Sequence, residues 1–114
     1  PFDAEAATNI GLVVSFPPTE AVTLATLETI ARRRQRSLFT QTAVRPEALL
    51  ALNHGGVARH DELLTAAAQS LARGGVKAIV LAQVSMAHLA EPLAQRLGLP
   101  VFESLSTSLK ALAS

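Results

Sequence analysis

Apolar positions along the chain follow two kinds of pattern, short unbroken runs and longer stretches with helical spacing. Short runs of β-branched and aliphatic residues are typical of strands that are buried on both faces of a parallel sheet. We expect strands near residues 10–15, 37–43, 76–82 and 100–103, and the strands at 10–15 and 76–82 are apolar runs of this kind. The run at 76–82 is the clearest, because it is nearly continuous and ends abruptly in polar residues.

Helical spacing of apolar residues predicts helices between these strands. Thr19 has the side chain of an N-cap residue, and we expect it to begin a helix that ends at the arginine-rich segment 32–36. Pro46 suits a first helical position and predicts a short helix through Leu52, which Gly55–Gly56 ends.

Three further helices are expected in the second half of the chain. Asp61 is the predicted N-cap of a longer helix that Gly74–Gly75 closes. Another helix follows residue 85 and runs to Leu97, and Pro92 either kinks this helix or begins its second half. A final serine-capped helix is expected over residues 104–112.

Strands that alternate with helices over short connections imply parallel pairing through right-handed crossovers. The predicted fold class is therefore α/β, a three-layer α/β/α sandwich with a four-stranded parallel sheet. At 114 residues the chain suits one compact core, so we expect residues 1–114 to form a single domain. With four Phe and neither Tyr nor Trp, that core must be aliphatic.

Charge and hydropathy exclude several classes of partner. The formal net charge is +1, and arginines at 32–36 complement the negative end of a helix dipole, so no nucleic-acid surface is expected. The longest apolar stretches, Ala48–Leu52 and Ala78–Ala82, are far shorter than the ~20 residues of a transmembrane helix. We expect no membrane partner and a cytoplasmic location.

The chain has no cysteine, which excludes disulfides, thiolate nucleophiles and thiolate metal sites. Its three histidines, His54, His60 and His88, lack the spacing of a metal site, so no metal is expected. Asp61 beside His60 could orient a general base, but adjacent residues at a helix start usually diverge. We therefore interpret Asp61 as a cap, and a chemical role for His60 or His88 stays open.

Ligands of parallel α/β sheets bind outside the carboxyl ends of the strands. In this chain those ends are the turns that carry Ser15 and Thr19, and Gln83 and Ser85. Hydroxyl and amide groups beside a helix N-terminus suit a carboxylate, so these four side chains are the candidate substrate-binding residues. Thr23 is a weaker candidate, because it lies one turn into its helix.

The segment Val80–Ala87, read Leu-Ala-Gln-x-Ser-Met at its centre, resembles the second signature loop of one branch of the aspartate/glutamate/hydantoin racemase family. His60-Asp61, Leu99–Val101 and the turn Ser15–Thr19 also resemble that branch, and Pro1–Asp3 resembles the entry to its second lobe. The resemblance covers nearly the whole chain but corresponds to the C-terminal lobe alone. The chain is either a natural half-length protein or a piece of a two-lobe protein.

The resemblance implies a cofactor-independent isomerase whose ligand is a small carboxylate or amino-acid-like molecule. In the family's racemases each lobe supplies one catalytic cysteine, but Gln83 stands at that position here. A neutral amide can bind a carboxylate and cannot act as a general base. The alternative is therefore a non-catalytic domain that binds a small ligand or self-assembles.

Self-association is the last expectation. A lobe that packs against a similar lobe keeps an apolar surface beside its site, and such surfaces are normally covered. The family's lobes are related by approximate two-fold symmetry, so we expect a homodimer that could place two Gln83 loops across one cleft.

Overall fold

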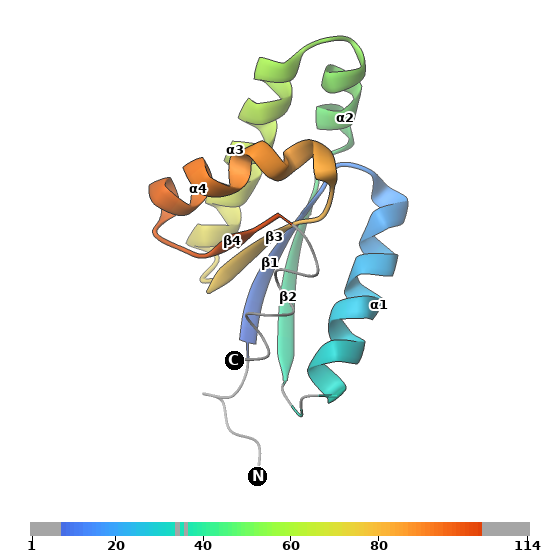
Figure 1. Cartoon of the computed structure of the whole chain (residues 1–114), viewed down its shortest axis with the longest axis vertical. Coiled ribbons are helices and arrows are strands. Elements are labelled where there is room, and N and C mark those ends of the chain that lie inside the picture. The colour runs from blue at the N-terminus through green and yellow to red at the C-terminus, as the bar shows by residue number, and fades with distance from the viewer. Residues whose placement is uncertain (1–7, 34, 36, 104–114) are drawn as a thin grey trace.

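The computed structural model describes residues 8–33, 35 and 37–103 (Figure 1). Its elements, in chain order, are β1 (Thr8–Val14), α1 (Pro17–Arg33), β2 (Leu38–Val44), α2 (Pro46–Asn53), α3 (Val57–Arg73), β3 (Ala78–Leu81), the 3-10 helix η2 (Val84–Leu89), α4 (Ala90–Leu97) and β4 (Val101–Phe102). The four strands form one parallel sheet in the order β2-β1-β3-β4. The predicted four-stranded parallel α/β fold is confirmed.

Helices cover both faces of the sheet, with α1 on one side and α3 and α4 on the other (Figure 1). Side chains alternate between the faces along each strand, so Val13 joins the apolar cluster beneath α3 and α4 while Leu12 and Val14 join the opposite cluster. The buried apolar residues are aliphatic, as expected, and they include Met86, which is fully buried in the first cluster.

Two predicted helix starts are wrong. The helix α1 begins at Pro17 instead of being capped by Thr19, whose backbone N–H already donates to the Phe16 carbonyl at 2.9 Å. Proline is favoured there because its fixed φ suits the first helical turn. The helix α3 begins at Val57 with Gly56 in the N-cap position, so Asp61 lies inside the helix and does not cap it.

The segment after Gln83 forms two helices where one was expected. The 3-10 helix η2 runs to Leu89, and α4 then begins at Ala90. Pro92 falls in the first turn of α4, where its missing N–H has no intrahelical partner to lose, so it begins the second half of the predicted helix. Gly98 ends α4 in the left-handed conformation, with φ 68°.

The final predicted helix, over residues 104–112, lies outside the described residues. None of the described helices combines the length and the apolar character that a bilayer crossing requires.

Gly11 lies at the middle of β1, where α3 packs closely on the sheet. A Cβ atom at this position would lie 3.1 Å from Leu71 Cδ1 and 3.2 Å from Val76 Cγ2. We expect Gly11→Ala to lower the free energy of unfolding by about 1 kcal/mol, because overpacking forces these neighbours to shift. Denaturant unfolding measures the loss.

The control for this prediction is the pair Gly11→Ala and Leu71→Ala. Truncating Leu71 removes its Cδ1, the nearest atom at 3.1 Å, but leaves its Cβ at 3.2 Å from the added methyl. The overlap is therefore relieved in part, and the double variant should lose somewhat less stability than the sum of the two single variants. Strictly additive losses would show that the two side chains do not meet.

Candidate functional site

Ser15 and Gln83 lie side by side at the carboxyl ends of the paired strands β1 and β3. The side-chain oxygen of Gln83 accepts three hydrogen bonds. Its donors are the Ser15 N–H at 2.7 Å, the Ser15 hydroxyl at 2.9 Å and the Phe16 N–H at 3.0 Å. The predicted proximity of these two strand ends is therefore confirmed.

These bonds fix the orientation of the Gln83 carboxamide. Two of its three partners are backbone N–H groups, which can only donate, so the group that faces β1 must be the oxygen. The NH2 group consequently points away from the β1 turn, and within the described part of the chain it donates to no protein acceptor. Gln83 can offer this donor pair to a ligand, but it has no free acceptor oxygen directed the same way.

The other predicted ligand residues lie nearby in the chain but are not joined to this pair by hydrogen bonds within the described residues. Thr19 is half-buried in the first turn of α1, and Ser85 is half-buried in η2. Thr23 is buried on α1. Because Pro17 and Pro18 have no N–H, the N-terminus of α1 offers few free donors to an anion.

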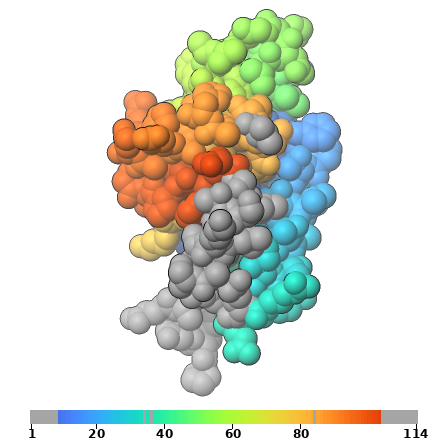
Figure 2. Space-filling model, in the orientation of Figure 1, coloured from blue at the N-terminus to red at the C-terminus, as the bar shows by residue number. Residues whose placement is uncertain are grey.

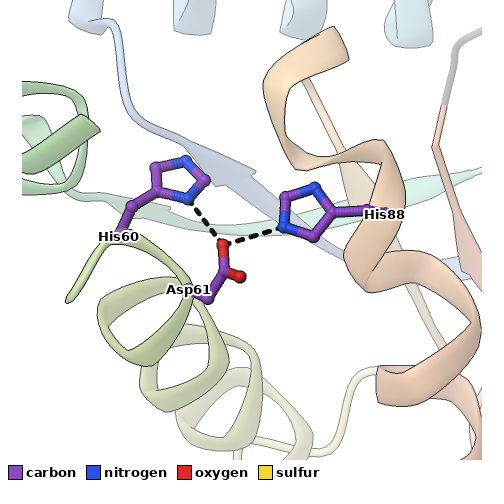
Figure 3. A group of neighbouring side chains, drawn as sticks. All are labelled: His60, Asp61 and His88. Carbon is purple, nitrogen blue, oxygen red and sulfur yellow. Dashed lines mark hydrogen bonds and ion pairs between the residues drawn. The ribbon is translucent and has the colours of Figure 1, made fainter. Parts of the chain in front are cut away.

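A second polar cluster lies at the same end of the sheet, where the beginning of α3 meets η2 (Figure 3). One carboxylate oxygen of Asp61 lies 2.8 Å from His60 Nδ1 and 2.9 Å from His88 Nε2. The two imidazole rings are stacked at 28° with centroids 6.3 Å apart. In the space-filling view, α2 and the beginning of α3 stand out beyond α4 at this end (Figure 2).

The three side chains of this His60–Asp61–His88 cluster differ in exposure. His60 is fully buried, and among the described residues its Nε2 has no hydrogen-bond partner, whereas the side chains of Asp61 and His88 are 29% and 51% exposed. Burial raises the pKa of the Asp61 carboxyl, but hydrogen bonds from His60 and His88, and their charge when protonated, outweigh burial and hold that pKa below its ordinary value. Asp61 is therefore a carboxylate at neutral pH.

This cluster corrects one interpretation of the sequence. The sequence predicts that the side chains of His60 and Asp61 diverge, because adjacent residues at a helix start usually do and Asp61 has the side chain of a cap. Since α3 begins one turn earlier, Asp61 needs no capping role and its carboxylate turns toward both rings. His88 lies 27 positions away from Asp61, so the spacing of the histidines along the chain carries no signal for this contact.

Asp61 also borders a surface groove of about 380 Å3 between α3 and α4. The groove presents a cation, Arg96, beside the acidic side chains of Asp61 and Glu62. A second groove of about 310 Å3 lies against α1 and β2, beside Glu28 and Arg32. Neither of these two grooves includes the four residues that the sequence predicted.

Comparison with known proteins supports the fold. No protein-family model matches the chain, and no curated protein matches its sequence. Among solved structures it is similar to a crystal structure described as a putative Asp/Glu racemase from Yersinia pestis, with a TM-score of 0.69 and 18% identity over 82% of this chain. The match covers 44% of that protein, so this chain spans less than half of its length. At this identity the likeness establishes a racemase-like fold.

Proposed function

We propose that this chain binds a small amino-acid-like carboxylate at the carboxyl ends of β1 and β3, as one lobe of a racemase-like isomerase. The observation that carries the proposal is the fixed carboxamide of Gln83, whose oxygen is held by Ser15 and Phe16. A locked amide presents its two N–H donors without first losing conformational freedom, which favours ligand binding.

In this proposal the four candidate residues have separate parts. Gln83 donates to the carboxylate, and Ser15 positions Gln83 by occupying its oxygen. The hydroxyls of Thr19 and Ser85 are additional donors, since each lies within a few residues of this pair. A carboxylate that bound the β1 turn directly would instead have to displace the Gln83 oxygen from its three donors.

Isomerisation at an α-carbon needs an acid–base group on each face of the substrate. Gln83 cannot accept the α-proton, and the sequence contains no thiol. The proposed isomerase therefore needs a second surface, either another lobe or a second copy of this chain in a homodimer. The match covers 44% of a putative Asp/Glu racemase, so more than half of that protein has no counterpart in the match.

Deuterium incorporation separates this function from its alternative. In D2O, an isomerase that forms an α-carbanion incorporates deuterium at the α-carbon of its substrate, which NMR detects. We expect incorporation into one member of a set containing both enantiomers of aspartate and glutamate. If a ligand binds and no deuterium enters, this chain by itself binds without catalysing, which favours the alternative of a non-catalytic binding domain.

Gln83→Glu should separate ligand binding from structural support. A carboxylate can accept the same three hydrogen bonds, so the fold should persist, but it offers no N–H donor and repels an anionic ligand. We expect carboxylate affinity to fall about 10- to 100-fold, the loss of one charge-assisted hydrogen bond. Calorimetric titration with aspartate and glutamate measures the change.

The matched control is Gln83→Leu. It removes the acceptor as well as the donor, so the buried Ser15 hydroxyl and N–H lose their partner and the free energy of unfolding should fall by about 1–3 kcal/mol. Undiminished binding by the folded Gln83→Glu variant would refute the assigned role of the amide.

A further inference from the structure

The His60–Asp61–His88 cluster brings together three side chains of the kinds that bind transition metals. Its ligand atoms are Nδ1 of His60, Nε2 of His88 and one carboxylate oxygen of Asp61, and all lie within 4.8 Å of one another (Figure 3). Two come from adjacent residues of α3 and the third from η2.

The separations are close to those that a bound ion requires. Bonds of about 2.0–2.2 Å in a tetrahedral site place neighbouring ligand atoms about 3.3 Å apart. The two nitrogens lie 2.8 and 2.9 Å from the Asp61 oxygen, so each pair needs to open by roughly half an ångström. The two nitrogens must approach one another by a larger amount if they start near the 4.8 Å limit. Rotation of the half-exposed His88 can open its own pair with Asp61 and bring the two nitrogens together. The His60–Asp61 pair opens by rotation of the Asp61 side chain, which is 29% exposed, because His60 is fully buried.

Metal binding does not increase the number of His60 ring nitrogens that lack a partner. In the hydrogen-bonded state Nδ1 carries the proton toward Asp61, and the buried Nε2 has no partner in the part of the chain that the structure describes. When Nδ1 binds an ion, the proton moves to Nε2, which again is the one ring nitrogen without a partner. The ion replaces two hydrogen bonds by three bonds to a cation.

Burial gives the site a closed side and an open side. His60 is fully buried and fixes one ligand from within the protein, while His88 is exposed and leaves space for water. Three protein ligands with an open fourth position are the usual arrangement of a zinc site that retains a water molecule. The mixed nitrogen and oxygen donors favour Zn2+ over Mg2+ or Ca2+, which prefer oxygen ligands.

We propose that His60, Asp61 and His88 bind one divalent transition-metal ion of the Zn2+ class, with water in the remaining position. This inference goes beyond the proposed carboxylate site and does not depend on it, because the ligand atoms are separate from Ser15 and Gln83. Asp61 also borders the groove that contains Arg96, so the ion would lie beside an open surface.

Zn2+ titration of the tag-free, chelator-treated chain tests the inference. Calorimetry should give one Zn2+ per chain, and Mg2+ should bind far more weakly. His88→Ala removes an exposed ligand, and Asp61→Asn keeps the acceptor oxygen but weakens a ligand; we expect each to reduce Zn2+ affinity at least about tenfold. Circular dichroism establishes that both variants remain folded.

His54→Ala is the matched control, because His54 is an exposed histidine outside the cluster. It should bind Zn2+ like the parent chain. Absence of Zn2+ binding by the parent, or parent-like affinity in folded His88→Ala, would show that the three residues form a hydrogen-bond network only. Equal binding of Mg2+ would overturn the assigned class of ion. None of these results depends on whether a carboxylate binds at Gln83.

Discussion

Leu64→Ala should lower the free energy of unfolding by about 2–5 kcal/mol. Leu64 is fully buried on α3, in the cluster that contains Leu81 and Met86. Truncation removes its apolar contacts and leaves a cavity that tightly packed neighbours fill incompletely. Domains of this size have about 5–15 kcal/mol of stability, so the loss should be visible as a large shift in the denaturant midpoint.

Leu50→Ala is the matched control for Leu64. The same change is made on the neighbouring helix α2, where Leu50 is 60% exposed, and it should alter stability by no more than about 0.5 kcal/mol. Similar losses in both variants would mean that the packing of α3 on the sheet does not dominate stability.

Asp61→Leu should lower the free energy of unfolding by about 2–3 kcal/mol in the presence of a chelator. The substitution removes the acceptor for His60 Nδ1 and His88 Nε2. His60 is fully buried, and its Nε2 already lacks a partner within residues 8–33, 35 and 37–103, so both ring nitrogens would then be unsatisfied in the interior. Denaturant unfolding measures the effect.

Two further variants identify the source of that loss. Asp61→Asn keeps an acceptor oxygen and loses the charge, so it should cost about 1 kcal/mol, less than Asp61→Leu. His60→Phe combined with Asp61→Leu removes the buried donor together with its acceptor, and it should recover part of the stability. A double variant as unstable as the sum of its single changes would assign the loss to packing instead.

The sequence predicts the sheet well because buried parallel strands read as short apolar runs, as at 76–82. Helix ends were predicted less well. Thr19 and Asp61 both have capping side chains, yet α1 and α3 begin one half turn and one turn earlier, respectively. A residue with a special backbone preference determines where each helix begins. For α1 this is Pro17, whose φ is fixed, and for α3 it is Gly55, which adopts a positive φ.

The two parts of the site differ in how far the sequence could reveal them. Ser15 and Gln83 follow two strands, and strand ends of a parallel sheet meet at one edge, so their contact could be predicted. The contact of Asp61 with His88 depends on where α3 begins and on η2 being a tight 3-10 helix. Neither property has a signal in the spacing of the histidines.

The central place of β1 also bears on how the chain folds during synthesis. Its pairing with β2 can form once residue 44 has emerged, but its other edge pairs with β3, which begins at Ala78. Ser15 and Gln83 lie 68 positions apart, so their contact closes a long loop late. Until then one edge of β1 is unpaired, and such edges promote association between incomplete chains. Because of this strand order, the second edge of β1 is covered only after the second half of the chain has been made and β3 has paired with it.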